Sequence, residues 1–188
     1  MRIISGTFRG KKIIEPKDIS TRPLKDLTKE SIFNIINHSK NFNIKLENSK
    51  ILDLFSGVGS FGIECLSRGV QKVIFIENYN GVLSILKRNL QSLKSTKNYT
   101  IIEEDIYNNK IFSTLDEKFN IIFLDPPFRY KNLENILINI INEKLLYKNG
   151  VIIIHRHKNE KDIFPKNFTI IEEKIYGISK IIFLSCLS

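Results

Sequence analysis

The feature that most constrains the fold is an alternation of strand-like and helix-like segments that begins at Lys50. Five short runs are dense in Ile, Val and Phe, which is typical of parallel strands buried on both faces. These predicted strands are residues 51–55, 72–76, 99–102, 121–124 and 151–155. Helices are predicted between them, at about residues 59–68, 80–93, 106–115 and 132–143. The alternation predicts an α/β fold, in which helices cover both faces of a mostly parallel sheet.

The end of the chain breaks this alternation. Residues 168–175 and 179–186 are both strand-like, and only residues 176–178 separate them. Two strands connected so closely pair antiparallel, as a hairpin. We therefore expect a Rossmann-like, seven-stranded sheet that finishes in an antiparallel hairpin.

A short extension, residues 1–40, precedes the alternating domain, residues 41–188. Two β-like pieces, residues 2–4 and 12–15, are joined through Gly6 and Gly10 and predict a small hairpin. Pro23 suits the first turn of a helix that continues to about His38.

The extension also carries most of the positive charge. The chain has a net charge of +9, and residues 1–50 hold 11 Lys and Arg against 5 Asp and Glu. Cations with an aromatic among them suit contact with RNA phosphates, and such contact predicts binding that weakens steeply with salt. A merely solvated arm is the alternative. The candidate RNA-binding residues are Arg2, Phe8, Arg9, Lys11, Lys12 and Lys17.

The sequence shows no sign of a membrane, secreted or disulfide-stabilised protein. The 188 residues are enough for one good-sized core. No apolar stretch approaches the roughly 18 residues that a membrane span needs, and the N-terminus lacks the apolar run of a signal peptide. Cys65 and Cys186 lie far apart and outside any C-x-x-C spacing, as expected of reduced packing residues. We expect a cytoplasmic protein without a membrane segment.

A glycine-rich turn follows the first predicted strand of the domain. Gly57, Gly59 and Gly62 form the G-x-G-x-x-G pattern between a strand and a helix, where glycines let the backbone pass close to a ligand. Glu77 ends the next strand about 20 residues on, where a carboxylate can accept hydrogen bonds from both hydroxyls of a ribose. The pattern predicts a ligand that contains ribose.

NAD and S-adenosylmethionine both fit that pattern. Asp53, facing the glycine turn, would repel a pyrophosphate but attract a sulfonium and an α-amino group, which favours S-adenosylmethionine. Asp105 follows a predicted strand and is placed to accept from an adenine 6-amino group, with Ile106 against the ring. Asp105 is equally suited to be the N-cap of the next predicted helix.

The sequence Asp125-Pro126-Pro127-Phe128 directly follows the apolar run of residues 119–124. Two prolines stop a strand and do not begin a helix, so a carboxylate, a carbonyl and an aromatic ring are left at the strand end. Acceptors beside a stacking face suit a planar group that carries an NH2, such as the exocyclic amine of a nucleobase. A strand-ending turn with a buried Phe is the structural alternative.

The sequence His155-Arg156-His157 closes the fifth predicted strand. The two histidines alternate across a strand end with no third ligand type nearby. We therefore expect solvated or base-contacting residues and no metal site.

Four blocks, in this order, resemble the bacterial RsmD-type small-subunit ribosomal RNA guanine-N2 methyltransferases. They are residues 1–10, residues 21–23 with 30–36, residues 53–64 with 67–69, and residues 123–128. The resemblance covers nearly the whole chain. It departs at Ser5, Ser56, Val58 and Phe61, where smaller or different residues are expected, and at residues 155–157, where the family pattern is expected to have an acid.

The resemblance implies a donor, S-adenosylmethionine, over residues 53–62, a guanine rotated out of its stack against Phe128, and direct methyl transfer. Asp125 and the Pro126 carbonyl, followed by Pro127, would hold the amine. Small-subunit (16S) ribosomal RNA or the assembling 30S particle would be the partner of a monomer. The implied donor-binding residues are Thr21, Arg22, Pro23, Asp53, Phe55, Ser56, Gly57, Gly59, Gly62, Glu77, Asn78, Asp105 and Ile106.

Two other functions are compatible with these residues. Transfer to adenine N6, cytosine N4 or a glutamine side chain is the nearest, although related enzymes with those targets usually carry Asn in place of Asp125. A non-catalytic RNA-binding assembly factor is the other, and intact Asp53, Glu77 and Asp125 argue against it.

Overall fold

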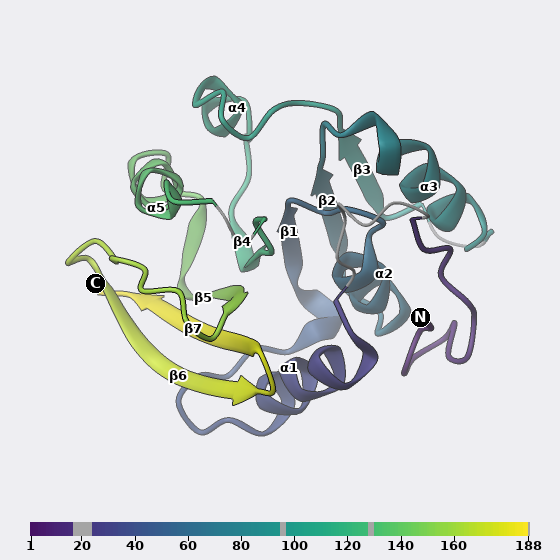
Figure 1. The fold of residues 1–188 in the computed structure, drawn as a ribbon, viewed down its shortest axis with the longest axis horizontal. Coiled ribbons are helices and arrows are strands. Elements are labelled where there is room, and N and C mark those ends of the chain that lie inside the picture. The colour runs from purple at the N-terminus through teal and green to yellow at the C-terminus, as the bar shows by residue number, and fades with distance from the viewer. Residues whose placement is uncertain (17–23, 95–96, 128–129, 188) are drawn as a thin grey trace.

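The computed structural model describes residues 1–16, 24–94, 97–127 and 130–187, and shows one seven-stranded sheet of order β3-β2-β1-β4-β5-β7-β6 (Figure 1). The first five strands are parallel, and β7 pairs antiparallel with both β5 and β6. The expected sheet with its terminal hairpin is therefore confirmed. The strands are β1 Lys50–Leu54, β2 Lys72–Ile76, β3 Tyr99–Ile102, β4 Phe119–Leu124, β5 Leu146–His157, β6 Phe168–Tyr176 and β7 Ser179–Cys186.

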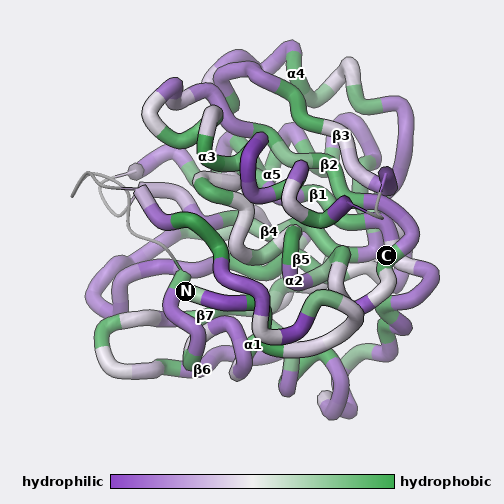
Figure 2. Tube along the Cα trace, turned by 90° about the vertical axis from the view of Figure 1, so that its right-hand side faces the viewer, coloured by the Kyte–Doolittle hydropathy of each residue, from purple (hydrophilic) through white to green (hydrophobic). Residues whose placement is uncertain are grey.

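Helices cover the two faces of the sheet unequally. Because side chains alternate along a strand, neighbours such as Ile51 and Leu52 belong to two different apolar clusters, one on each face. The odd-numbered face packs against α1 Asp26–His38, α2 Ser60–Ser67 and α3 Asn80–Gln91. The even-numbered face packs against α4 Lys110–Ser113 and α5 Leu133–Asn142. Figure 2 shows hydrophobic segments along the central strands and hydrophilic ones on the outer loops.

Two of the predicted helices differ from the observed ones. The predicted helix 106–115 is wrong in length, because α4 has four residues and Asp105–Asn108 forms a turn, with the Asn108 N–H donating to the Asp105 carbonyl at 2.9 Å. Asn and Asp side chains compete for backbone hydrogen bonds and favour such turns over a helix. Helix α1 begins at Asp26, after the expected start, and Pro23 itself lies outside the described residues.

The expected hairpin of the extension is reduced to a single antiparallel bridge between Arg2 and Lys12. Two backbone bonds flank the bridge, from the Ile3 N–H to the Lys11 carbonyl at 2.9 Å and from the Ile13 N–H to the Met1 carbonyl at 3.1 Å. Both isoleucines are buried in the same apolar cluster as α1, α2 and α3. The extension is thus packed onto the domain through its apolar side chains.

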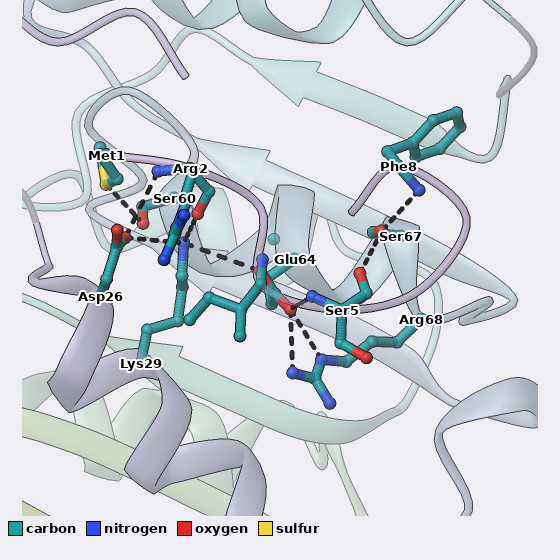
Figure 3. A network of polar contacts seen from close by, with 12 residues as sticks. Met1, Arg2, Ser5, Phe8, Asp26, Lys29, Ser60, Glu64, Ser67 and Arg68 are labelled. Atoms are coloured by element: carbon teal, nitrogen blue, oxygen red, sulfur yellow. Dashed lines mark hydrogen bonds and ion pairs between the residues drawn. The ribbon is translucent and has the colours of Figure 1, made fainter. Parts of the chain in front are cut away.

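Buried charges hold the extension in place as well (Figure 3). Glu64 of α2 is fully buried, and its carboxylate accepts from the backbone N–H groups of Ile4 at 2.8 Å and Ser5 at 2.9 Å. Arg68 donates to the same carboxylate at 2.9 Å. Lys29 of α1 is also fully buried; its Nζ lies 3.7 Å from Glu64 and donates to the Arg2 carbonyl at 2.8 Å. Both helices therefore fix the backbone of the first residues.

The chain passes over the end of α2 at Gly6. This residue has φ +82°, and a Cβ built there would lie 1.8 Å from the carbonyl oxygen of Ser67. The next residue uses that approach, because the Thr7 N–H donates to the same oxygen at 2.7 Å. Only glycine combines this φ with this contact.

Candidate active site

A pocket of about 830 Å³ lies beyond the carboxyl ends of the central strands. Neighbouring β1 and β4 mark the point where the strand order reverses, which is where open α/β sheets bind ligands. Among the described residues that line the pocket, five carry carboxylates and none is Lys or Arg. The acids are Asp53, Glu77, Glu104, Asp105 and Asp125.

The glycine turn is held tightly against the sheet at the base of this pocket. A Cβ on Gly62 would lie 2.3 Å from the Phe75 ring, so only glycine lets α2 approach the strand here. That approach brings the Gly62 N–H to 3.0 Å from Asp53 Oδ2. Gly59 has φ +85°, and Phe55, which also lines the pocket, has φ +59°, uncommon for a residue with a side chain.

Asp53 is an acid in an unusual environment, because its side chain is buried at the end of β1. Burial raises the pKa of its carboxyl well above the ordinary value; the hydrogen bond from Gly62 opposes this shift, and the charges of Asp125 and Glu77 add to it. A bound cation would favour the ionised form. The position therefore suits a positively charged ligand.

Glu77 joins the end of β2 to the glycine turn. Its Oε2 accepts from the Gly57 N–H at 2.7 Å, and its Oε1 accepts from the N–H groups of Asn78 and Tyr79, both at 2.9 Å. Glu77 and Asn78 line the pocket, as does Ser56, whose Oγ donates to the Asp53 carbonyl at 2.6 Å. The carboxylate thus orders the loop backbone around the expected ribose site.

Asp105 and Ile106 also line the pocket. The Asp105 carboxylate accepts from the Tyr107 N–H at 2.9 Å, which closes a local turn. The alternative role as a helix N-cap is wrong, because α4 begins only at Lys110.

Three aromatic rings, those of Phe55, Tyr107 and Tyr130, pack together beside this turn. The Tyr130 ring lies 5.5 Å from that of Phe55 and 5.3 Å from that of Tyr107. Burial chiefly, with Tyr107 and Asp105 nearby, raises the pKa of Tyr130 to about 12, so its hydroxyl stays protonated. Phe55 and Tyr107 line the pocket and offer ring surface to a ligand.

Asp125 and Pro126 lie at the pocket edge directly after β4, as the sequence predicts. Pro127 also lines the pocket, but its carbonyl accepts from the Tyr130 N–H at 2.8 Å and from Arg156 at 3.4 Å. This carbonyl is therefore already bonded within the chain. Phe128, Thr21, Arg22, Pro23 and Lys17, which the sequence also proposes, lie outside the described residues.

His155 also lines the pocket, although the sequence did not place it among the donor-binding or catalytic residues. Of the two expected roles, the solvated one is wrong, because its side chain is only 4% exposed, and contact with a base stays a prediction. The ring Nδ1 lies 2.8 Å from Asp125 Oδ1, and Nε2 lies 3.0 Å from Ser179 Oγ. The register could have indicated the first contact, because β4 and β5 pair Leu124 with Ile154, and one further step in parallel sets Asp125 beside His155.

Arg156 points to the opposite face and is likewise buried, not solvated. Its guanidinium lies 2.9 Å from an oxygen of Asp162 and donates to the Tyr130 carbonyl at 2.8 Å. Together with its contact to Pro127, these bonds attach the backbone on both sides of residues 128–129 to β5. Arg156 thus supports the pocket edge from behind and is not among the described residues that line the pocket.

The candidate RNA-binding residues fall into two groups. Arg2, Arg9 and Lys12 are exposed, which suits phosphate contact. Lys11 Nζ donates to the Ser92 carbonyl, and Phe8 packs partly against the core while its N–H donates to Ser67 Oγ at 3.0 Å. The extension therefore presents cations from a fixed backbone.

The described ranges show neither a cluster of metal ligands nor a membrane-spanning helix. No group of three or more His, Cys, Asp or Glu side chains there is arranged to hold a metal ion. Among the helices of the same ranges, none has the length and apolar character needed to cross a membrane.

Comparison with known proteins gives consistent matches along the chain. The model of a family described as Conserved hypothetical protein 95 matches residues 1–185. Ribosomal RNA small subunit methyltransferase D of Haemophilus influenzae is 33% identical over 183 residues, or 95% of this chain and 90% of the relative. The protein of the same name from Escherichia coli K12 is 30% identical over 181 residues, or 94% and 85%. A solved structure described as a putative methyltransferase, yhhF, from Escherichia coli has a TM-score of 0.83 at 26% identity, covering 100% of this chain and 98% of that one.

Proposed function

We propose that this chain, which belongs to the family described as Conserved hypothetical protein 95, is a methyltransferase that transfers a methyl group to the N2 amine of a guanine in small-subunit ribosomal RNA. The family match and the relatives confirm the resemblance that the sequence indicated. The observation that carries the proposal is the Asp125 carboxylate at the edge of a cation-favouring pocket.

S-adenosylmethionine fits this pocket as methyl donor. The described lining carries five carboxylates and no Lys or Arg, which disfavours the pyrophosphate of a dinucleotide and favours a sulfonium with an α-amino group. Asp53 would face that positive charge, the backbone at Gly57 and Gly59 would lie along the ligand, and Glu77 would accept from the ribose. When bound, the donor supplies an electrophilic methyl group.

Asp105 and Ile106 would hold the adenine, the carboxylate accepting from the 6-amino group. Thr21, Arg22 and Pro23 would lie at the methionine end of the donor, by family resemblance. The described pocket residues lie on both sides of the strand-order reversal, which suits an elongated ligand.

The target amine would bind at Asp125. Guanine N2 is a poor nucleophile because its lone pair is delocalised into the ring. Hydrogen bonds from its two N–H groups to the Asp125 carboxylate and the Pro126 carbonyl would localise that pair and aim the nitrogen at the methyl group. The carboxylate would also stabilise the positive charge that develops on nitrogen. Phe128 would provide the stacking face for the flipped base.

RNA would approach over the exposed cations of the extension, residues 1–40. Arg9→Ala and Lys12→Ala should each weaken RNA binding and reduce the salt slope of log K by about one, because each removes one phosphate contact. Lys148→Ala is a matched control, since this exposed lysine lies near the start of β5, at the opposite end of the strand from the pocket. An equal loss in the control would contradict a specific RNA surface.

A methylation assay tests the central proposal. Purified protein, given labelled S-adenosylmethionine and unmodified small subunits or naked small-subunit RNA, should produce N2-methylguanine. Asp125→Ala should abolish the product, whereas Asp116→Ala, at an exposed acid remote from the pocket lining, should not. Label on adenine, cytosine or protein would refute the substrate. Donor and RNA binding without turnover would favour an assembly factor. We further propose that the enzyme is a cytoplasmic monomer and needs no metal.

A further inference from the structure

His155 lies in the wall of the pocket, and its two ring nitrogens have different partners. One faces the proposed catalytic carboxylate, with Nδ1 2.8 Å from Asp125 Oδ1. The other faces a hydroxyl, with Nε2 3.0 Å from Ser179 Oγ. The imidazole therefore connects Asp125 to the hairpin strand β7.

The fold fixes this arrangement through side-chain alternation. His155 continues the odd-numbered face of β5 after Val151 and Ile153, and Asp125 continues the same face of β4 after Phe123. On β7, Ser179 pairs with His157 and so is a diagonal neighbour of His155 on that face. All three polar side chains therefore meet at one corner of the sheet.

The hydrogen-bonding capacity of the three groups allows one consistent assignment for a neutral ring. An ionised carboxylate only accepts, so Nδ1 carries the proton and donates to Asp125. Nε2 then accepts, and the Ser179 hydroxyl donates to it. The acceptor-only carboxylate thereby sets the tautomer, and the Ser179 hydroxyl, which can donate or accept, satisfies Nε2 in it.

Asp125 has little else to orient it. Its side chain is 20% exposed and is followed by two prolines, which offer no N–H donors. The other ionisable groups that line the pocket around the pair are Asp53, Glu77, Tyr79, Glu104, Asp105 and Tyr107. The four carboxylates among them do not donate when ionised. Among the described residues, His155 is the side chain that donates to this carboxylate.

We propose that His155 is a positioning residue for methyl transfer: its Nδ1–H holds Asp125 Oδ1 so that Oδ2 faces the amine of the target base. The inference rests on the proposed function. Asp125 would otherwise rotate about its side-chain bonds, and small misplacements at the reacting atoms cost rate steeply. Positioning of Asp125 affects the rate of methyl transfer. It does not affect the affinity for the donor, which the glycine turn would bind.

Three substitutions at this position separate positioning from packing. His155→Asn places an amide N–H near the location of Nδ1 and keeps the bond to Asp125. His155→Gln reaches toward Ser179 instead, and His155→Leu fills a similar volume without a donor. For each variant, the maximal methylation rate and the KM for small-subunit RNA are measured, with donor affinity by calorimetry as the control for an intact fold.

The Leu variant should lose about 10- to 100-fold in maximal rate, the effect expected when a hydrogen bond to a charged group is removed. The Asn variant should recover most of that loss and the Gln variant little of it. The KM for RNA and the donor affinity should change only slightly in all three.

Other outcomes would overturn the inference. Equal rates for Leu and wild type, or equal losses for Asn and Leu with donor affinity intact, would show that the Nδ1–H does not position Asp125. A wild-type protein that methylates no guanine would refute the proposed function first, and the positioning role with it. The two failures are thus distinguishable in one experiment.

Discussion

Replacing Glu64 by Gln should be one of the most destabilising conservative substitutions in this chain. The carboxylate is fully buried and accepts from the N–H groups of Ile4 and Ser5 and from Arg68, with Lys29 3.7 Å away. A glutamine of the same shape keeps one acceptor but turns an NH2 toward donors. It also leaves the buried ammonium of Lys29 without its fully buried partner.

The magnitude follows from these contacts. Removing one member of a buried ion pair typically costs about 3–5 kcal/mol of unfolding free energy. For a chain of this size, a loss of that order lowers Tm by about 2–4 °C per kcal/mol, or roughly 10 °C in total. Glu30→Gln, an exposed acid of α1, is the control and should change stability by less than about 0.5 kcal/mol.

The pH dependence gives a second, independent check. Burial lowers the pKa of Lys29, while Glu64 and Asp26 raise it in opposition. Without Glu64 the pKa of Lys29 in the folded protein falls further below the ordinary lysine value. At a pH between the folded-state pKa and the ordinary pKa, Lys29 is neutral in the folded protein but still protonated in the unfolded chain. Because the unfolded chain binds more protons in that window, the free energy of unfolding rises with pH there. The deficit of Glu64→Gln relative to wild type should therefore shrink as pH increases through that window.

Urea unfolding of wild type and both variants between pH 7 and pH 9.5 measures these effects. A loss below about 1 kcal/mol at pH 7 would refute the buried-pair reasoning. A deficit that grows with pH would refute the assignment of the proton to Lys29. Binding of the demethylated donor product should stabilise all variants by mass action and keep the least stable one measurable.

Three further substitutions test the glycine turn, the extension and the ion pairs of Glu117 with Lys50 and Lys72 at the start of β1 and β2. Asp53→Asn keeps an acceptor for the Gly62 N–H but removes the charge, so S-adenosylmethionine should bind about 10- to 100-fold more weakly at pH 8. The affinity of the wild type should rise with pH through the raised pKa of Asp53. Calorimetry that gives both proteins the same affinity and the same pH profile would contradict this. Gly6→Ala should lower the free energy of unfolding in urea by more than about 2 kcal/mol, because it combines left-handed backbone strain with a clash against the end of α2. Gly10→Ala is the control: Gly10 has φ +83° but nothing within 4 Å of an added Cβ, so its substitution should cost only the strain. Equal losses in the two variants would disprove the clash. Burial would raise the pKa of Glu117, but its partners Lys50 and Lys72 lower it overall, so Glu117→Gln should reduce the free energy of unfolding by about 1 kcal/mol at pH 7. This difference in stability should disappear as pH falls through the folded-state pKa of Glu117. A difference that persists at acid pH would argue against the ion pairs.

Local sequence signals were sufficient for much of the fold. The Ile-rich runs and the short connection expected at residues 176–178 predicted the seven strands, because burial on both faces and short connections leave few alternatives. In the structure the connection is shorter still, residues 177–178. The glycine turn and Asp125 were placed at the pocket for the same reason, since the carboxyl ends of parallel strands share one edge. Where polar residues compete with the helix, at residues 105–109, the prediction was wrong.

The sequence by itself thus determined the order of the elements, the edge at which the site forms and most of its acids. Only the tertiary structure decided which distant side chains meet there. The pairing of His155 with Asp125 depends on register and on a common face of two strands, and Glu64 meets the first residues because α2 packs against them. Such contacts carry no local pattern, because side chains that look solvated in sequence become buried once the sheet brings a partner within hydrogen-bonding distance.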